Sequence, residues 1–462
     1  MRKIFILSVL ALVLLIAVPT AVLADADIDD NGVIDLSDLI LVTNFFGKTS
    51  GYDSEADSDT NGIIDIYDVV YVASRVGTTM PEENIVYANS CNLADVKAAI
   101  DSANYGDIVQ LPEGTCDWDN ELLTYKEVHV RGAGRDKTII RRSPSSPSHY
   151  VFIYDAERVD GQPETIARFK FSGIKLVDPR GPYGDYNSSQ ITAGLTLRYG
   201  AKDFLVYDSE FQGFSDAGVF VRDYERDHVL IPDGRSWGVI YNNRFIDCYM
   251  GGLGYGVSVY GSQDKDWDIH PLDLGGSHAV FIEDNYFSGE RHTVASGSGS
   301  RYVFRYNTIE NNRRSHMIDA HGWTGDETYS NRGSRQYEIY GNTLIGNNVH
   351  YPDGIGIRGG DGVIFNNVMR NYVAYPIFLT HDNMYLCCTN DSYPCHDQIT
   401  ELHMWNNTED GVLINSVGQT GNAQVALFGT CITDILQEGR DFFFTPRPNY
   451  TPYPYPHPLR SS

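Results

Sequence analysis

The chain has 462 residues and a formal net charge of −26, with 61 acidic residues against 35 lysines and arginines. Residues 25–80 alone hold twelve acids against Lys48 and Arg75, so this short segment contributes −10 of the total charge. The remaining excess is spread thinly along the chain. Such a balance excludes nucleic acid and anionic membrane surfaces as expected partners.

The first 24 residues have the pattern of a secretory signal. Arg2 and Lys3 precede an apolar run over residues 4–18, and the small residues that follow predict cleavage before Asp25. A retained membrane anchor is the alternative, but the run is short for a bilayer span and no later stretch could serve. We therefore expect an exported protein without a retained anchor, either extracellular or attached to the cell surface.

A twelve-residue acidic motif occurs twice, at residues 27–38 and 57–68. Oxygen-bearing residues at positions 1, 3, 5, 9 and 12, a backbone carbonyl at position 7 and glycine at position 6 suit a hard cation. The pattern predicts two bound Ca²⁺ ions, although a single loop of this kind could be a solvated turn. The predicted ligands are Asp27, Asp29, Asn31, Val33, Asp35 and Asp38, and Asp57, Asp59, Asn61, Ile63, Asp65 and Asp68.

Each acidic loop leads into an apolar segment, at residues 39–46 and 69–76, which predicts a helix ended by Gly47 or Gly77. The loops lack an entering helix and end in Asp, so they are EF-hand-like without being standard EF-hands. This pattern resembles a dockerin over residues 25–79. The resemblance implies calcium-dependent docking onto a cohesin-bearing scaffold or surface protein, with residues 80–89 as a linker. Leu36-Ser37 and Ile66-Tyr67 depart from the small hydroxyl pair of many dockerins, which leaves the cohesin class open.

Seven cysteines in an exported chain predict disulfides with at least one thiol left over. Cys91 and Cys116 flank one compact segment and form the best candidate pair. One further bridge is expected in the crowded loop of Cys387, Cys388 and Cys395, where a zinc site is the less favoured alternative. Cys248 and Cys431 are expected to be buried.

From about residue 90 the chain consists of short strand patterns, and an asparagine recurs in units of the form apolar-x-x-Asn-x-apolar. The members are Asn243, Asn285, Asn307, Asn342, Asn367 and Asn407, at intervals of 42, 22, 35, 25 and 40 residues. The shorter intervals suit one turn of a β-solenoid and the longer ones a turn with an inserted loop. Stacked amides at a bend can satisfy backbone groups. We therefore predict a structural role for these asparagines.

Strands with period-2 alternation begin near residues 195, 219, 257, 318, 355 and 377. Their outward residues form a predicted column on one sheet, made of Arg198, Arg222, Tyr260, His321 and Arg358, with Asp319 beside His321. Long insertions at about 223–238, 261–279, 322–336 and 381–401 follow several of these strands. Loops along one edge of a sheet predict a groove for an extended polymer.

The opening of this region, with Val96-Lys-Ala-Ala-Ile100 before Gly106-Asp-Ile-Val-Gln-Leu-Pro-Glu-Gly114 and Val128-His-Val-Arg-Gly-Ala-Gly134, resembles the start of a pectin-lyase-like protein. The resemblance implies a mainly β fold, a right-handed parallel β-helix over residues 90–445. The Pro- and Tyr-rich residues 446–462 are expected to cap the last coil, with a recognition tail as the alternative. The implied activity is a lyase or glycosidase acting on a polysaccharide.

Reactive side chains are densest at Glu290-Arg-His292 and at residues 313–321. The 22-residue interval predicts that Arg291 lies beside Arg313 and His292 beside Arg314, and such neighbouring cations call for an anion between them. An acidic glycan supplies that anion, and proton abstraction beside a uronate carboxylate needs its charge neutralised. The predicted catalytic residues are His321, Asp319, His292 and Arg291, and the predicted substrate-binding residues are Arg198, Arg222, Tyr260, Arg313 and Arg358.

Three alternatives stay open at this point. Asp319 either orients His321 or binds a metal, which would be a further Ca²⁺ in the groove. Hydrolysis would need a second carboxylate, for which Asp353 and Asp361 are the candidates. A non-catalytic glycan-binding or adhesion component would use the same residues as surface ion pairs.

Overall fold

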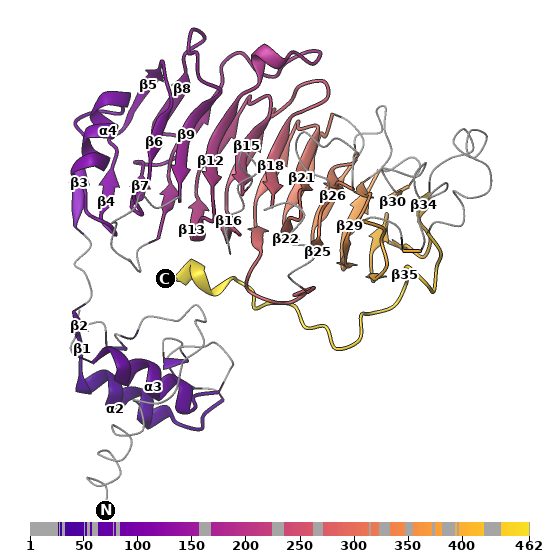
Figure 1. Cartoon of the computed structure of the whole chain (residues 1–462), viewed down its shortest axis with the longest axis horizontal. Helices are drawn as coiled ribbons and strands as arrows, with labels where there is room; N and C mark the ends of the chain where they lie inside the picture. The colour runs from indigo at the N-terminus through magenta and orange to yellow at the C-terminus, as the bar shows by residue number, and fades with distance from the viewer. Residues whose placement is uncertain are drawn as a thin grey trace, which may run out of the picture. The chain divides into compact units, whose positions relative to one another are not determined.

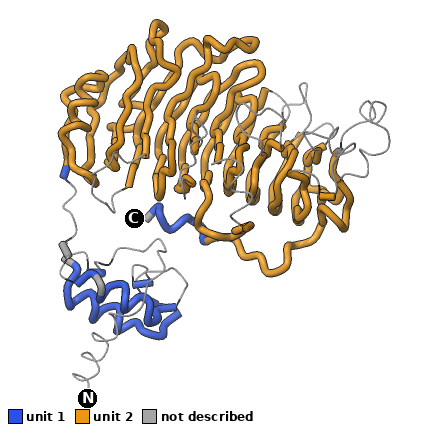
Figure 2. The backbone as a smooth tube through the Cα atoms, viewed as in Figure 1, with its two compact units in different colours: residues 1–84, 454–462 blue, residues 85–453 orange. Residues whose placement is uncertain are grey.

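The structure is a computed structural model. It describes residues 26–461 except 27, 30–32, 50, 53–55, 58–62, 77, 80–83, 157–167, 224–234, 262–270, 314–315, 323–332, 347–353, 372–374, 381–392, 395–396 and 420–435. The chain forms two compact units, residues 1–84 with 454–462 and residues 85–453 (Figure 2). Among the described residues, no helix is both long enough and apolar enough to cross a membrane. The predicted signal segment lies outside them.

The N-terminal unit contains two helices, α2 (Leu36–Phe45) and α3 (Ile66–Arg75), and a short antiparallel pair of β1 (Val33–Ile34) and β2 (Thr78–Thr79). Both helices occupy the predicted apolar segments. Gly47 follows the end of α2 with a φ of 80°, as a helix-ending glycine does, and Gly77 is not among the described residues. The small core of this unit includes Ile34, Val42, Ile64 and Val72.

The end of each acidic loop also starts a helix. The Asp35 carboxylate accepts a hydrogen bond from the Ser37 amide (2.5 Å), and the Asp65 carboxylate accepts one from the Tyr67 amide (2.7 Å). Three residues further on, Asp38 and Asp68 accept the Asp35 and Asp65 amides at 2.8 Å each. These reciprocal capping boxes satisfy amides that a helix start leaves without partners.

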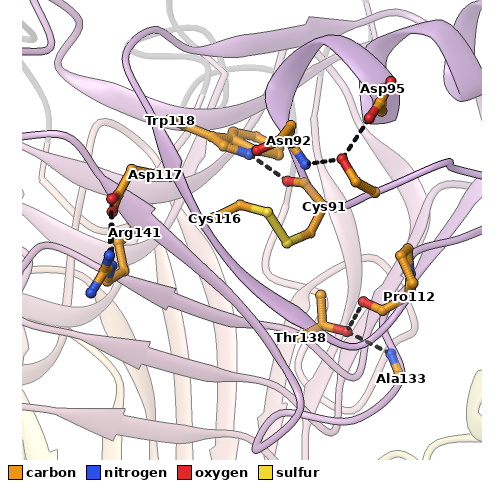
Figure 3. Close-up of a disulfide and its surroundings, with 11 residues drawn as sticks. Cys91, Asn92, Asp95, Pro112, Cys116, Asp117, Trp118, Ala133, Thr138 and Arg141 are labelled. Atoms are coloured by element: carbon orange, nitrogen blue, oxygen red, sulfur yellow. Dashed lines mark hydrogen bonds and ion pairs between the residues drawn. A yellow bond between two sulfur atoms is a disulfide. The ribbon is translucent and has the colours of Figure 1, made fainter.

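The second unit begins with β3 (Ile85–Tyr87) and helix α4 (Leu93–Ser102), the stretch that the sequence predicts as amphipathic. Figure 3 shows the predicted Cys91–Cys116 disulfide beside this helix, and the Trp118 Nε1–H group donating to the Cys91 carbonyl (2.9 Å). The bridge joins the chain before α4 to the first coil. Cys248 is free and buried, whereas Cys387, Cys388, Cys395 and Cys431 lie outside the described residues.

Three long sheets, numbered 1 to 3 here, build the rest of the unit, with 12, 11 and 10 strands in the described part of the chain. Sheet 1 contains β3, β4 (Ile108–Gln110), β7 (His129–Arg131), β10 (Lys170–Ser172), β13 (Lys202–Tyr207), β16 (Trp237–Tyr241), β19 (Val280–Glu283), β22 (Arg301–Arg305), β25 (Gln336–Tyr340), β28 (Asp361–Phe365), β31 (Leu402–Trp405) and β35 (Phe442–Phe443). Sheet 2 contains β5 (Gly114–Trp118), β8 (Thr138–Arg142), β11 (Lys175–Val177), β14 (Glu210–Gln212), β17 (Arg244–Ile246), β20 (Tyr286–Ser288), β23 (Thr308–Glu310), β26 (Thr343–Ile345), β29 (Val368–Arg370), β32 (Thr408–Glu409) and β33 (Val412–Leu413). Sheet 3 contains β6 (Leu122–Thr124), β9 (Tyr150–Asp155), β12 (Ala193–Arg198), β15 (Ala217–Arg222), β18 (Tyr255–Tyr260), β21 (His292–Gly297), β24 (Ile318–Ala320), β27 (Ile355–Ile357), β30 (Ile377–Leu379) and β34 (Gly418–Gln419).

From β4 to β32, strands that are three apart in the chain pair in parallel. At the ends of the sheets the parallel pairs are β3–β4, β30–β34 and β31–β35, and β32–β33 is antiparallel. The chain therefore visits the three sheets in turn and rises by one strand per coil, which is a parallel β-helix (Figure 1). The predicted mainly β solenoid is confirmed. Its right-handed winding stays a prediction, which parallel crossovers favour.

The recurring asparagines form one hydrogen-bonded ladder at the turn between sheets 1 and 2. Asn285 accepts the Asn243 side-chain amide (3.1 Å), and the same contact repeats through Asn307, Asn342, Asn367 and Asn407. From Asn285 to Asn407, each side-chain oxygen also accepts the backbone amide of the previous asparagine in the ladder. The structural role predicted for these residues is confirmed.

The C-terminal segment takes a different course from the predicted cap on the last coil. Thr445 contacts His403 through its carbonyl, Tyr450 stands edge-on to Trp405, and the Tyr453 carbonyl accepts a bond from Arg305 at 2.7 Å. Residues 445–453 thus run back over the outer face of sheet 1. Stacked aromatic side chains in successive strands of that sheet give the tyrosines an apolar surface to pack against.

Candidate functional site

The outer face of sheet 3 carries the column of side chains that the sequence predicts. Strand register aligns Arg198 with Arg222 and Tyr260, and His321 and Arg358 directly follow the strands β24 and β27. In full, the column is Asp155, Arg198, Arg222, Tyr260, Gly297, His321 and Arg358. Because parallel strands are about 4.8 Å apart, each member stands one such step from the next.

Asp319 is the centre of this face. It lies in β24 between the inward-facing Ile318 and Ala320, so period-2 alternation points it outward beside His321. Arg358 binds its carboxylate with a fork, Nε to Oδ1 at 3.0 Å and Nη2 to Oδ2 at 2.7 Å. The Nε2 atom of His321 lies 2.7 Å from the same Oδ2. The structure thus brings together Asp319, His321 and Arg358.

The charges around Asp319 decide its protonation state. Burial alone would raise the pKa of this carboxyl, because the side chain is fully buried. Arg358, His321 and His292 act in the opposite direction and hold the pKa well below its usual range. Asp319 is therefore a permanent anion near neutral pH, able to hold an imidazole in place but unable to supply a proton.

His321 is the imidazole that reaches the surface of this cluster. Its side chain is 20% exposed, and its Nε2 atom faces Asp319. An anionic carboxylate 2.7 Å from Nε2 favours the tautomer that has its proton on that nitrogen, with Nδ1 as the basic one, even though the contact is not aligned as a hydrogen bond. This is the arrangement of an oriented general base.

His292 lies in the same cluster but below its surface. The ring is stacked between Tyr255 (centroids 5.7 Å apart) and His316 (6.2 Å), and its side chain is 2% exposed. Its Nδ1 atom contacts the His316 carbonyl, and its Nε2 atom lies 3.6 Å from an Asp319 oxygen. Burial lowers the pKa of His292 well below its usual range, so the ring is neutral. His292 supports the cluster from within.

The backbone of Arg313 lies beside that of Arg291, as the 22-residue interval predicts, because the Arg313 amide donates to the Glu290 carbonyl (2.8 Å). The register changes only after Arg313. Tyr286 pairs with Thr308, 22 residues on, but Val294 pairs with Ile318, 24 residues on, because the turn before β24 is two residues longer. Arg291 contacts the Tyr255 hydroxyl (3.3 Å) at the start of β21.

The guanidinium group of Arg313 points away from Arg291. It donates to the Gly289 carbonyl (2.9 Å) and forms an ion pair with Asp247 (2.5 Å), both next to strands of sheet 2. Arg314, the predicted neighbour of His292, lies outside the described residues. Arg291 and Arg313 are therefore neighbours along the backbone, but their guanidinium groups bind different partners.

The N-terminal part of the column combines arginines with aromatic rings. Arg198 forms an ion pair with Asp155 (2.9 Å), and Arg222 contacts the Tyr150 hydroxyl (3.3 Å). Phe220 stands edge-on to Tyr260 with centroids 5.7 Å apart. Together with Tyr255 and three alanines, these rings form an apolar cluster on the outer face of sheet 3.

The second carboxylate expected for hydrolysis is not supplied by Asp361. This residue begins β28 in sheet 1, and its carboxylate accepts the amides of Thr400 and Glu401 at 2.8 Å each. It therefore ties two segments of the scaffold together in a different sheet from Asp319. Asp353, the other candidate, lies outside the described residues.

Sequence reasoning missed one strand of this face, β21, which places His292 and Gly297 in the sheet. Its strand pattern begins with a polar pair, His292-Thr293, and lacks the glycine–apolar start of the other strands. Val294 and Ser296 both face the core, and this period-2 alternation is the pattern that could have identified the strand.

Part of the predicted calcium-binding set can be placed. The carboxylates of Asp38, Asp57 and Asp68 are buried in the small N-terminal unit, and such acidic side chains are rarely buried without a counter-charge. Their all-oxygen chemistry fits a hard cation. Four predicted ligands, Asp27, Asn31, Asp59 and Asn61, lie outside the described residues. The residues that the structure describes contain no group of three or more His, Cys, Asp or Glu side chains that could hold a metal ion.

Sequence comparison finds no matching protein-family model and no matching curated protein. Among solved structures, ORF18 of Geobacillus virus E2 is 13% identical with a TM-score of 0.42, over 73% of this chain and 59% of the viral one. The catalytic unit of a GH87 α-1,3-glucanase from Streptomyces thermodiastaticus is 12% identical (TM-score 0.41, 79% of this chain and 69% of that one). Pectin methylesterase PemA from Erwinia chrysanthemi is 11% identical (TM-score 0.34, 77% and 97%). The chain spans about three fifths of the viral protein, and likeness at these levels says nothing about the reaction.

Proposed function

We propose that this protein is an exported lyase that cleaves an acidic polysaccharide by β-elimination at the outer face of sheet 3. The observation that carries the proposal is the contact of His321 Nε2 with Asp319, whose carboxylate is in turn held by the fork of Arg358. An oriented, partly exposed imidazole beside fixed positive charge is what proton abstraction next to a carboxylate needs.

In this reaction His321 Nδ1 takes the proton on C5 of a uronate. The electron pair of that C–H bond forms the C4–C5 double bond, and the bond from C4 to the glycosidic oxygen breaks. Asp319 keeps the imidazole oriented and stabilises the imidazolium that forms. The departing oxygen takes up a proton from solvent, and His321 later releases to solvent the proton that it took from C5. The products are an unsaturated sugar end and a new reducing end, so no water is consumed.

The column favours an acidic, extended substrate. Arg222 and Arg198 continue from the His321 cluster along the same register, and arginine binds carboxylates well. A chain laid across successive coils would meet these residues in turn. Because Arg358 is committed to Asp319 through two nitrogens, we assign it to holding the cluster rather than to the main carboxylate contact.

The test is to incubate the full chain with polyuronates and follow the ultraviolet absorbance of unsaturated ends together with new reducing ends. His321→Asn should lower kcat by about 10²–10⁴-fold, the usual contribution of a general base, without lowering the melting temperature. His278→Asn is the matched control, since His278 also faces an aspartate, Asp273 at 3.9 Å, but near sheet 1. Reducing ends without unsaturation would mean hydrolysis and would contradict the proposal.

A non-catalytic glycan-binding or adhesion role is the second candidate. The apolar cluster of Phe220, Tyr255 and Tyr260 beside the charged residues supports it, because aromatic and arginine side chains on one face can hold a sugar without cleaving it. Retained binding across a glycan panel, with neither unsaturated nor reducing ends formed, would favour this role.

We further propose that the N-terminal unit is a dockerin-like module that binds two Ca²⁺ ions and docks onto a cohesin. Apolar side chains at the starts of both helices support this, since Leu36, Ile40, Ile66 and Tyr67 are each about half exposed or more. Chelation should unfold residues 25–79 and leave the β-helix melting transition in place. A single transition that is insensitive to chelation would contradict it.

A further inference from the structure

The C-terminal segment that covers the outer face of sheet 1, residues 445–453, belongs to no helix or strand. Three of its nine residues are prolines, which have no N–H to donate to a strand. Polar contacts with side chains hold its two ends, between Thr445 and His403 (3.0 Å), Arg447 and Glu401 (3.0 Å), and Tyr453 and Arg305 (2.7 Å). The segment can therefore leave the sheet without breaking a ladder of strand hydrogen bonds.

The middle of the segment closes over a fully buried carboxyl group, that of Glu338 in β25. The Tyr450 hydroxyl donates to its Oε2 atom, and the Gly275 amide donates to its Oε1 atom (2.8 Å). Gly275 belongs to a turn at residues 273–276, and a Cβ added to it would lie only 2.1 Å from the Thr451 carbonyl oxygen. The turn and the segment thus touch each other, and Glu338 lies beneath the place where they meet.

The charges around Glu338 do not balance an ionised carboxylate at this place. Arg305 of β22 faces it, but Nε and Nη2 of this arginine bind the carboxylate of Glu283 at 2.7 Å each. The other groups that face Glu338 are Asp273 of the turn, Tyr450 of the segment, Tyr340 of its own strand, and Val303 and Val363 of the two neighbouring strands. Burial therefore raises the pKa of Glu338 to about 7, which Arg305 and the two hydrogen bonds oppose only in part.

We propose that Glu338 is the switch of a pH-sensitive closure: the C-terminal segment and the turn stay closed over its protonated carboxyl and open locally when it ionises. A buried carboxylate needs water or a counter-charge, and displacing these two pieces of chain admits water to it. The sheet itself stays folded, because β25 pairs with β22 and β28 on either side. This inference does not depend on the proposed function, since none of these residues lies on sheet 3.

The pH dependence of the closure has a definite sign. In the open state Glu338 returns to water and to its ordinary pKa of 4.5, so protonation favours the closed state. The opening equilibrium should rise as the pH increases from 4.5 towards 7 and level off above 7. With these two pKa values, it should increase about 10²-fold between pH 5 and 8.5.

Hydrogen exchange of the full chain, followed by mass spectrometry, measures this opening. After correction for the intrinsic pH dependence of exchange, peptides covering residues 445–453 and 273–276 should exchange about 10²-fold faster at pH 8.5 than at pH 5. Peptides from β22 and β25 should keep their protection. A flat profile for the wild-type segment, or loss of protection in β22 and β25 together with it, would overturn the inference.

Variants separate the switch from the contacts that merely hold the segment. The amide of Glu338→Gln keeps the shape of the carboxyl but cannot ionise, so exchange of the segment should be equally slow at both pH values. Glu290→Gln is the matched control, because it changes another buried carboxyl with a raised pKa, located between β20 and β21, and should keep the wild-type increase.

Arg447→Gln weakens one end of the segment and leaves the switch in place. Exchange should become about two- to fivefold faster at both pH values, the range for a partly exposed ion pair, with the same increase between them. An undiminished increase in Glu338→Gln, or an increase that is lost in Glu290→Gln or Arg447→Gln, would also overturn the inference.

Discussion

The outer faces of sheets 1 and 3 each hold a buried carboxylate bound by an arginine, yet they are built for different purposes. On sheet 3, Asp319 is bound by Arg358 and His321, whose side chains remain about one fifth exposed. On sheet 1, Glu283 accepts both Nε and Nη2 of Arg305 at 2.7 Å, and Arg305 is fully buried. The same kind of ion pair is therefore open to solvent on one face and sealed on the other.

The C-terminal segment explains this difference. The Tyr453 carbonyl accepts a bond from Nη1 of Arg305, and Tyr450 binds Glu338, so residues 445–453 seal the outer face of sheet 1. No such segment crosses the cluster around Asp319 in the described part of the chain. A buried ion pair by itself does not indicate function. What distinguishes the Asp319 cluster is a titratable partner, His321, that reaches the surface.

The largest effects are expected from removing the two carboxylates, because each removal takes the counter-charge from a buried or largely buried arginine. Glu283→Ala and Asp319→Ala should each cost about 3–5 kcal/mol of unfolding free energy. Only Asp319→Ala should also lower kcat per folded molecule, measured after correcting for the folded fraction. Asp117→Ala breaks the exposed pair with Arg141 and should cost less than about 1 kcal/mol. Equal losses of kcat for Glu283→Ala and Asp319→Ala would remove the distinction between the two faces.

A smaller effect is expected from pH, with opposite sign on the two faces. Burial raises the pKa of Glu338, beneath the C-terminal segment, from 4.5 to about 7. Its folded form holds the proton more tightly, so this stabilisation is full below about pH 4.5 and is lost as the pH rises through 7. The loss amounts to about 3 kcal/mol. Asp319, whose pKa is lowered, contributes stability that is present above about pH 4 and lost at lower pH.

Unfolding free energies from urea titrations between pH 4.5 and 9 measure this dependence, and Glu338→Gln should flatten the neutral part of the curve. The groups facing Glu338 are Arg305, Tyr450 and Asp273, together with the Gly275 amide at 2.8 Å. If stability falls from pH 5 to 8 as steeply in Glu338→Gln as in the native chain, another group controls the dependence.

The smallest effect concerns the C-terminal segment itself. Tyr450→Phe removes the hydroxyl that binds Glu338 but keeps the ring against Phe365 and Trp405. The expected cost is about 1–2 kcal/mol, the range for a hydrogen bond to an ionisable group. Thermal unfolding measures it, with Tyr306→Phe as the control. A shift of kcat in Tyr450→Phe would mean that the two faces are coupled rather than independent.

Much of the fold could be read from short-range patterns. The asparagine spacing marks the turns of the solenoid, and period-2 alternation places Arg198, Arg222 and Tyr260 in one column. Strand β21 was not predicted because its sequence lacks the glycine–apolar start of the other strands. The place of Gly297 in the column was therefore not predicted either. Arg291 and Arg313 do lie side by side along the backbone, but their guanidinium groups separate because Arg313 binds the Gly289 carbonyl and Asp247 while Arg291 contacts Tyr255.

The sequence by itself determined the elements that depend on neighbours along the chain: the oxygen pattern of the acidic loops, the helices they start, and the strands and turns of each coil. Only the tertiary structure decided which charges meet. Arg358 binds Asp319 from a coil 39 residues away, and Arg305 meets Tyr453 across 148 residues. Such contacts depend on insertion lengths and on the path of the C-terminal segment. No local periodicity encodes these, because burial and charge pairing are properties of the assembled coils.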